Sequence, residues 1–228
     1  HAGHRDTASY ENASGPVNVT LEPSYWTAIN SGDAEGDEFY GIENLTGSNL
    51  GDKLYGDTGK NVIDGGKGND TMYGGAENDT LYADQGRDKA YGESGDDELH
   101  VSADPANLPS IIDGGAGTDI LVLDGLVSGD YDLTALAGLD SRIENVEVLD
   151  IRGDGVNSNI AITGQDILNM LDTGSVAVLV VRADSGDQLD LTAFAGEGET
   201  FTPTAQAGYT EYSISDGAEI AQIHWYTV

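Results

Sequence analysis

A nine-residue period dominates the middle of the chain. From Gly47 to His100 the sequence divides without a gap into GSNLGDKLY, GDTGKNVID, GGKGNDTMY, GGAENDTLY, ADQGRDKAY and GESGDDELH, and a seventh copy, GGAGTDILV, occupies residues 114–122. Position 1 is Gly in six of the seven copies, and position 6 is Asp in six, with Asn61 as the exception. Position 8 is apolar in all seven copies: Leu54, Ile63, Met72, Leu81, Ala90, Leu99 and Leu121. So short a period, with one regularly placed apolar residue per copy, predicts a solenoid in which stacked copies share one core.

Each repeat combines a tight turn with a short strand. Glycine at the early positions permits the positive φ angles of such a turn, and the last three residues form a minimal strand whose middle side chain points to one face. Two repeats then make one coil of a flattened helix. The two facing sheets should carry these core rows: Leu54, Met72 and Ala90 in one, and Ile63, Leu81 and Leu99 in the other. We therefore predict an all-β chain, a parallel β-roll with β-rich flanking caps and one short helix.

The acidic turns are predicted to bind calcium. Each turn should lie against the turn 18 residues away, so that the position-6 side chains form two rows. Hard oxygen ligands suit Ca²⁺, which takes about 6–8 oxygens in flexible geometry, whereas transition metals prefer clusters of His or Cys. Asp and Gly also serve as plain turn formers, but stacked carboxylates repel one another without a cation between them. The predicted metal-site residues are Asp52, Asn61, Asp70, Asp79, Asp88, Asp97 and Asp119, with the turn glycines Gly56, Gly65, Gly68, Gly74, Gly92, Gly114 and Gly117.

Net charge and composition exclude several classes of protein. The 228 residues include 41 Asp and Glu against 9 Lys and Arg, and the formal net charge of −32 is opposite to that of a nucleic-acid binder. No apolar run reaches about 18 residues, so we expect no membrane span. The absence of Cys excludes disulfides and thiol catalysis. High acidity with few aromatic residues is also typical of disorder, but the phased repeat favours a folded chain.

The nonapeptides resemble the RTX (repeats-in-toxin) β-roll of proteins exported by bacterial type I secretion systems. The segment GIENLTGSNLGDKLYG, residues 41–56, is similar to the usual start of such a roll. AGHRDTASY, residues 2–10, is similar to the tail of a further repeat with Asp6 at the metal position, so we expect the natural chain to extend before His1. Leu50 and Glu77 replace turn glycines, and Asn61 replaces an Asp. We therefore expect the turns that begin at Gly47 and Gly56 to bind calcium more weakly, or to close one end.

The regions beside the roll have a different composition. We divide the chain into an N-terminal flank or cap (residues 1–40), an RTX β-roll (41–122) and a β-rich C-terminal capping region that the resemblance implies carries a secretion signal (123–228). Thr163 and Asp166 form a plausible capping box for a short helix. The phrase IENVEVLDIRGDGVNSNIAITGQDILNMLD, residues 143–172, is similar to the C-terminal end of large RTX adhesins.

No catalytic motif accompanies the repeats, and we expect no enzyme activity from this chain. Neither H-E-x-x-H nor G-x-S-x-G occurs, and the four histidines are scattered: His1, His4, His100 and His224. Because many RTX proteins carry an enzyme elsewhere, one alternative is the non-catalytic RTX domain of a secreted hydrolase, such as a protease or lipase, or of an epimerase.

The expectation that these observations favour is a calcium-dependent folding, stabilising and secretion module at the C-terminal end of an extracellular bacterial adhesin. The resemblance implies secretion, with the bacterial cell surface as the site of action. Its partners would be several calcium ions, the type I secretion machinery, and a cell-surface glycan or protein. A third alternative is direct binding of a glycan or peptide, for which Tyr55, Tyr73 and Tyr91, placed 18 residues apart, could form an aromatic ladder, although such rings also pack on one another in ordinary sheets.

Overall fold

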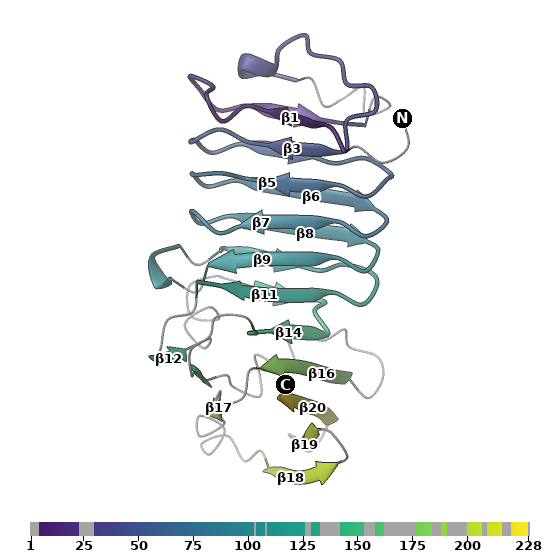
Figure 1. Cartoon of the computed structure of the whole chain (residues 1–228), viewed down its shortest axis with the longest axis vertical. Coiled ribbons are helices and arrows are strands. Elements are labelled where there is room, and N and C mark those ends of the chain that lie inside the picture. Colours follow the sequence, from purple (N-terminus) through teal and green to yellow (C-terminus); the bar gives the residue numbers. More distant parts are fainter. Residues whose placement is uncertain are drawn as a thin grey trace.

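Short strands stack along one axis into two facing sheets (Figure 1). The computed structural model describes residues 5–22, 30–102, 104–107, 109–125, 129–132, 142–152, 158–161, 177–183, 188–190, 200–206, 209–215 and 220–227. The first sheet has eleven strands, in the order β1 (Thr7–Ser9), β3 (Asn44–Thr46), β5 (Val62–Asp64), β7 (Thr80–Ala83), β9 (Glu98–Ser102), β11 (Ile120–Asp124), β14 (Val148–Asp150), β16 (Ala177–Ala183), β20 (Ile220–Thr227), β19 (Tyr209–Ser215) and β18 (Thr200–Gln206).

The second sheet has six strands, in the order β13 (Arg142–Glu144), β10 (Ile111–Asp113), β8 (Lys89–Ser94), β6 (Thr71–Ala76), β4 (Lys53–Tyr55) and β2 (Asn18–Thr20). A separate sheet of three strands contains β12 (Gly129–Asp132), β15 (Ser158–Ala161) and β17 (Gln188–Asp190). The described residues also include two short 3-10 helices, η1 (Gly32–Ala34) and η2 (Pro105–Asn107). All pairs within the repeats are parallel, so the prediction of an all-β parallel roll is confirmed.

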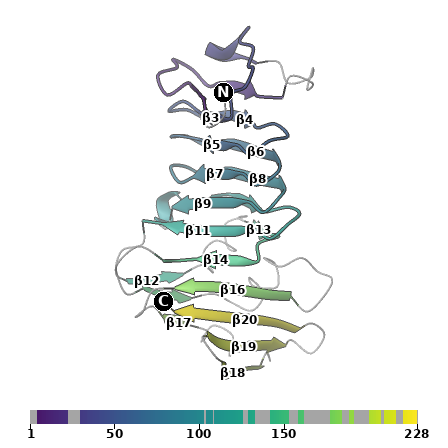
Figure 2. The same ribbon diagram turned by 45° about the vertical axis from the view of Figure 1, so that its right-hand side comes forward.

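Consecutive coils pair with a shift of 18 residues. Ile63 of β5 lies opposite Leu81 of β7 in the first sheet, and Met72 of β6 lies opposite Ala90 of β8 in the second. Figure 2 shows β5 with β6, and β7 with β8, at successive levels of the stack, so that each coil gives one strand to each sheet. The position-8 side chains fill the space between the sheets, and the two predicted core rows are confirmed: Leu54, Ile63, Met72, Leu81, Ala90 and Leu99 have no exposed surface.

A four-residue insertion changes the register once without breaking the core. Residues 101–104 fall outside the nine-residue phase, and β9 runs on to Ser102 before η2 begins. After it, Ile112 of β10 pairs with Ala90, and Leu121 of β11 pairs with Leu99. The first two additional residues lengthen β9, and η2 projects beside β9 in Figure 1, so the inward rows continue unchanged.

Both flanks extend the roll. On the N-terminal side β1 pairs with β3 and β2 with β4, and Val19 and Ala34 are buried in the shared core. On the C-terminal side β14, β16 and β20 continue the parallel stack, after which β19 and β18 add antiparallel strands. The helix expected after Thr163 lies outside the described residues. No helix in the part of the chain that the structure describes is long and apolar enough to cross a membrane.

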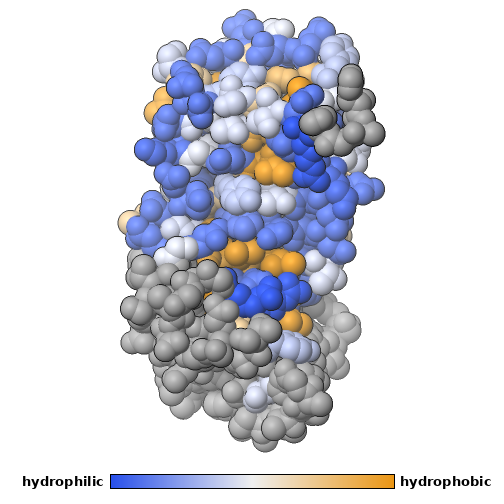
Figure 3. Space-filling model, viewed as in Figure 1, coloured by the Kyte–Doolittle hydropathy of each residue, from blue (hydrophilic) through white to orange (hydrophobic). Residues whose placement is uncertain are grey.

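The face of the molecule seen in Figure 3 is largely hydrophilic, with apolar side chains visible only in patches between the polar turns. Two large hydrophobic side chains among the described residues are exposed, Tyr40 and Leu50. The apolar side chains of the repeats therefore lie mainly between the sheets, and the turns present oxygen-rich surfaces along the edges of the stack.

Candidate metal centre

The acidic turns form two rows along the edges of the roll. The first row contains residues 47–52, 65–70 and 83–88, and the second contains 56–61, 74–79, 92–97 and 114–119. Within each row the backbone N–H of one position-6 residue donates to Oδ1 of the next. Asp52 donates to Asp70 at 2.7 Å and Asp70 to Asp88 at 2.8 Å in the first row. The second row repeats the pattern at 2.8 Å for each bond, and joins Asn61, Asp79, Asp97 and Asp119.

The second oxygen of each carboxylate has no partner. Five Oδ2 atoms are buried without a hydrogen bond: those of Asp70, Asp79, Asp88, Asp97 and Asp119. A buried carboxylate oxygen without a partner costs far more free energy than one exposed to water. The sequence places these groups inside the turns, and the fold leaves one oxygen of each available for a cation.

Bare glycine backbone completes the space around these oxygens. A Cβ placed on Gly74 would lie 2.5 Å from Oδ2 of Asp79 and 2.8 Å from the carbonyl oxygen of Gly92. At Gly92 the same construction meets Oδ2 of Asp97 and the carbonyl oxygen of Gly114. A carboxylate oxygen and a carbonyl oxygen from the next turn thus converge over a Cα that carries no side chain. Such a set of hard oxygens fits Ca²⁺.

Backbone carbonyls are essential to this kind of site. Among the described residues, no three side chains of His, Cys, Asp or Glu gather closely enough to hold a metal by themselves. Position 6 supplies one buried carboxylate in each turn that ends in Asp, and calcium commonly takes carbonyl oxygens as well as carboxylates. The donor set is therefore that of a calcium site and differs from the His and Cys clusters of zinc.

Burial raises the pKa of the carboxyls in both rows. The pKa reaches about 8 for Asp70, about 7 for Asp79 and Asp119, and about 6 for Asp88. The pKa of Asp97 is also raised. Desolvation is the largest cause in every case. The backbone N–H bond to Oδ1 acts in the opposite direction, and nearby carboxylates add to the rise. The carboxyls of the metal-free turns therefore hold their protons to higher pH than ordinary aspartates do, and a bound cation would keep the carboxylates ionised.

Asp150 shows what a nearby cation does to a buried carboxylate in the same molecule. Desolvation raises its pKa, but hydrogen bonds from Arg152 and the positive charges of Arg152 and Arg182 bring the pKa below the ordinary value. Nε of Arg152 lies 2.9 Å from Oδ1, and Nη1 of Arg182 lies 3.6 Å from Oδ2. The two arginines thus provide beside Asp150 the positive charge that the acidic turns lack.

In two of the predicted ligands, every side-chain oxygen already accepts a hydrogen bond. Oδ2 of Asp52 accepts from the Ser48 backbone N–H at 2.5 Å, and Oδ1 accepts from Val17 at 2.7 Å. Asn61 accepts from the backbone N–H of Asp57 at 2.7 Å, and its Nδ2 donates to the Glu43 carbonyl at 2.9 Å. Both residues occupy the predicted rows, but neither has an unpartnered oxygen. These are the turns that begin at Gly47 and Gly56.

Two glutamates extend the second row beyond the repeats. Oε2 of Glu147 accepts from the Asp119 backbone N–H at 2.9 Å, and Oε2 of Glu43 accepts from Asp6 at 2.9 Å. Each stands immediately before a strand, as position 6 does in every nonapeptide. Sequence reasoning missed both, because they lie outside the period. Their place before a strand was the only available signal.

The predicted turn glycines stand where backbone freedom or close approach is required. Gly56, Gly65, Gly74, Gly92 and Gly114 occupy position 1, each against the position-6 side chain of its own turn. Gly68 and Gly117, at position 4, have φ of +128° and +152°. Two glutamates also have positive φ where other repeats have glycine. Glu77 stands at position 4 (66°), and Glu93 stands at position 2 (73°).

His100 lies outside the turns, between two carboxylates. Its Nδ1 is 2.6 Å from Oδ2 of Asp124, and its Nε2 is 3.1 Å from Oε1 of Glu98. The ring stacks on Tyr82 with centroids 4.5 Å apart. Both ring nitrogens therefore lie against carboxylates on the outer face of the first sheet.

Comparison with known proteins agrees with this geometry. The family model described as RTX calcium-binding nonapeptide repeat (4 copies) matches residues 46–81 and 73–104. No curated protein matches the chain. The matched ranges contain the turns whose buried Oδ2 atoms lack partners at Asp70, Asp79, Asp88 and Asp97. Residues 46–104 thus carry RTX calcium-binding nonapeptide repeats, and these repeats fold here as a parallel β-roll.

Proposed function

We propose that this chain is a calcium-dependent folding and stabilising module at the C-terminal end of an extracellular bacterial adhesin, exported by a type I secretion system. The observation that carries the calcium dependence is the set of five buried Oδ2 atoms without hydrogen-bond partners. Calcium supplies the positive charge that these oxygens lack. Because the site does not exist in the unfolded chain, the free energy of binding becomes free energy of folding.

The balance of forces supports coupled folding and binding. Each nonapeptide places one side chain in the core, and the chain carries a net charge of −32. So little apolar burial offsets the conformational entropy of the chain poorly, and the charge repulsion opposes compaction. A chain of this kind can remain unfolded where calcium is scarce, cross a narrow export channel, and fold outside the cell where calcium is abundant.

The unpartnered oxygens also support a division of the turns into two groups. We assign calcium binding to the turns that end at Asp70, Asp79, Asp88, Asp97 and Asp119. The turns that end at Asp52 and Asn61 satisfy their own side chains through Ser48, Asp57 and Glu43. On this assignment, hydrogen bonds stabilise the turns of the first coil, and bound calcium stabilises the turns of the later coils.

The three-part division of the chain (1–40, 41–122 and 123–228) belongs to this proposal. Strand β14 pairs directly with β11, the last strand of the repeats, and β16 pairs with β14, so residues 123–228 would give the metal-bound coils a folded surface on which to form. A truncation that ends at Val122 should need distinctly more calcium to fold. If it folds at the same calcium concentration as the full chain, the C-terminal part contributes nothing to folding of the roll.

The experiment that tests the proposed function is a calcium titration of the full chain, followed by far-ultraviolet circular dichroism. We expect little β-structure in chelator and a cooperative gain of β-structure in the range of about 10⁻⁴–10⁻³ M calcium, typical of extracellular modules. Magnesium at the same concentrations serves as the control, since it demands stricter octahedral geometry. Identical spectra in chelator and in millimolar calcium would exclude calcium-dependent folding.

A further inference from the structure

The second row of acidic turns continues beyond the nonapeptides into one more coil. Strands β13 and β14 form this coil, in which β13 pairs with β10 and β14 pairs with β11. The turn between β13 and β14 has the three residues 145–147, whereas the last nonapeptide turn has the six residues 114–119. A shorter turn therefore lies against the last acidic turn of the repeats.

Glu147 is the last residue of the short turn and takes the place of a position-6 carboxylate. Its Oε2 accepts from the backbone N–H of Asp119 at 2.9 Å, as Oδ1 of Asp119 itself accepts from Asp97 at 2.8 Å. The backbone N–H groups of Glu147 and Val148 donate to the carbonyl oxygen of Asp119 at 3.2 and 3.0 Å. Because a glutamate side chain is longer than an aspartate by a methylene group, it reaches the same donor from a shorter turn.

The backbone of the short turn also supplies a carbonyl oxygen to the ligand space of Asp119. A Cβ built on Gly114 would meet Oδ2 of Asp119 at 2.7 Å, and it would also meet the carbonyl oxygen of Asn145. At Gly92 the corresponding carbonyl oxygen belongs to Gly114. Asn145 has φ of +54°, which Asn tolerates better than most residues, and its Nδ2 donates to Oδ1 of Asp113 at 2.7 Å. The short turn thus holds its carbonyl oxygen where the repeats place that of a glycine.

Asp119 and Glu147 place two carboxylates side by side at a buried position. Asp119 has no exposed surface, and its Oδ2 has no hydrogen-bond partner. Burial raises the pKa of Asp119, and the nearby carboxylates of Asp97 and Glu147 raise it further. Like charges in such a desolvated place favour a cation between them. Carboxylate and carbonyl oxygens together are the donors that Ca²⁺ takes in proteins.

Glu43 also stands directly before a strand, at the other end of the row, but no buried oxygen without a partner lies beside it. Its Oε2 accepts from the Asp6 backbone N–H at 2.9 Å. The Asp6 side chain is exposed, and the side-chain oxygen of Asn61, in the next turn, already accepts from Asp57. Glu43 therefore has the same kind of hydrogen bond without the ligand space, and it provides a matched control for Glu147.

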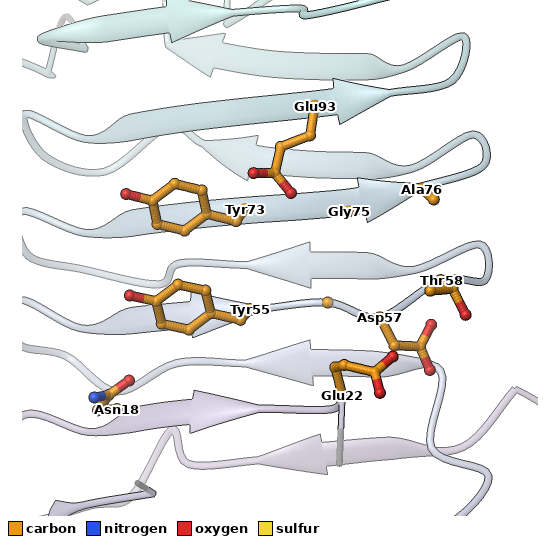
Figure 4. Close-up of a pocket in the computed structure, with 10 residues that line it drawn as sticks. Asn18, Glu22, Tyr55, Asp57, Thr58, Tyr73, Gly75, Ala76 and Glu93 are labelled. Atoms are coloured by element: carbon orange, nitrogen blue, oxygen red, sulfur yellow. The ribbon is translucent and has the colours of Figure 1, made fainter. Parts of the chain in front are cut away.

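Other carboxylates near this row differ because water reaches them. A pocket of about 410 Å³ on the outer face of the second sheet is lined by the side chains of Glu22, Asp57 and Glu93 (Figure 4). All three are at least partly exposed, and none has a buried oxygen without a partner. The expected tyrosine ladder forms beside the pocket, with 4.8 and 4.9 Å between ring centroids. The pocket thus contains no desolvated carboxylate oxygen comparable to Oδ2 of Asp119.

We propose that Glu147 is a calcium ligand outside the repeats, and that one ion joins its carboxylate to Oδ2 of Asp119 and to the carbonyl oxygen of Asn145. This inference rests on the proposed calcium dependence of the roll and extends it to the first coil beyond the nonapeptides. Because β14 follows Glu147 directly and pairs with β16, the ion would attach the C-terminal strands to the roll. The order of β14 should therefore depend on calcium through Glu147.

The test follows hydrogen–deuterium exchange of the full chain during a calcium titration, with β14 and β7 as two reporters in one molecule. Glu147→Gln removes the charge but keeps an amide oxygen that can accept from the Asp119 N–H. We expect the calcium concentration at which β14 gains half of its protection to rise by about tenfold, because ligand charge sets the affinity of calcium sites. The β7 midpoint should rise by less than about threefold, since each coil contacts only its neighbours. Glu43→Gln should leave the β14 midpoint unchanged.

Glu147→Asp keeps the charge on a shorter side chain and should restore part of the calcium affinity. Circular dichroism in saturating calcium shows whether each variant folds. Equal β14 midpoints in Glu147→Gln and Glu43→Gln would overturn the proposal, as would a Glu147→Asp variant that binds calcium no better than Glu147→Gln. If neither variant of Glu147 folds in saturating calcium, the residue has a structural role and the proposal is wrong.

The two reporters also separate this proposal from the proposed function. If β7 of the unmodified chain gains no protection in calcium, calcium-dependent folding of the roll itself is wrong, and the shared ion is excluded with it. If β7 responds to calcium while the β14 midpoint is the same with and without Glu147→Gln, only the shared ion is excluded.

Discussion

The backbone N–H of Asp79 donates a 2.8 Å hydrogen bond to Oδ1 of Asp97, 18 residues further along the chain. Oδ2 of the same Asp97 side chain is buried and has no partner. One carboxylate therefore fixes the backbone of the preceding coil and also presents an oxygen to a cation. This double use couples metal binding to coil stacking, because loss of the carboxylate removes both interactions together.

Replacement of one row carboxylate should weaken calcium-dependent folding. We expect Asp79→Asn to raise the calcium concentration at the folding midpoint by about tenfold, equivalent to about 1.4 kcal/mol. Glu77→Gln removes the same charge two residues away, from an exposed side chain, and should shift the midpoint little. Calcium titration of both variants by circular dichroism gives the comparison. Equal shifts would show that total charge controls folding and that the assignment of Asp79 as a ligand is wrong.

Restoring the consensus carboxylate at Asn61 should create a further calcium site. In Asn61→Asp, the donor Nδ2 that now bonds to the Glu43 carbonyl is replaced by an acceptor. We expect more calcium bound per chain, measured by elemental analysis after dialysis, and lower stability in chelator. Asn12→Asp adds the same charge at an exposed position in the N-terminal flank and should leave the calcium content unchanged. An unchanged calcium content in Asn61→Asp would contradict the assignment.

The stability of the metal-free fold should increase as the pH falls. The folded-state pKa values of Asp70, Asp79, Asp88 and Asp119 lie at about 6 to 8, above the ordinary value of 3.8. The folded state therefore binds more protons than the unfolded state, so this contribution is fully present below pH 3.8 and is lost as the pH rises through 6 to 8. In chelator, we expect more β-structure at pH 5 than at pH 8.

Calcium should reverse the direction of this pH dependence. Protons and calcium compete for the same oxygens, so the calcium midpoint should rise as the pH is lowered from 8 to 5. Circular dichroism across this range, with and without chelator, measures both effects. If the chelated chain is equally unfolded at every pH, the row carboxyls do not titrate within the fold.

A methyl group at Gly74 should obstruct one calcium cradle. The added Cβ would lie 2.5 Å from Oδ2 of Asp79 and 2.8 Å from the Gly92 carbonyl oxygen, both closer than real Cβ contacts. We expect Gly74→Ala to raise the calcium midpoint and to lower the melting temperature in calcium. In Gly15→Ala the added Cβ meets nothing within 4 Å, so differential scanning calorimetry should show little change. Similar behaviour of the two variants would argue against a ligand space beside Gly74.

Much of this architecture could be predicted from the repeat. The position-8 residues determined which side chains face inward, because a strand of three residues has one middle side chain and a nine-residue period returns it to the same sheet every second copy. The same period placed the position-6 carboxylates in two rows. The shortage of apolar residues indicated that a bound cation must contribute to the stability of the fold. These properties are local or strictly periodic, so they can be read directly from the chain.

Only the tertiary structure decided how the oxygens are used. Whether a side-chain oxygen accepts a hydrogen bond depends on how its own turn closes in three dimensions, which the period does not specify. Asp52 and Asn61 each accept from a backbone N–H four residues earlier in their own turn, whereas Oδ2 of Asp70 and Asp79 has no such bond, although all four residues occupy position 6. Glu147 joins the second row through a connection whose length breaks the period, so that its place could not be counted from the sequence. The period determines which residues become neighbours, and the packing of the coils determines which of their polar atoms remain available to a ligand.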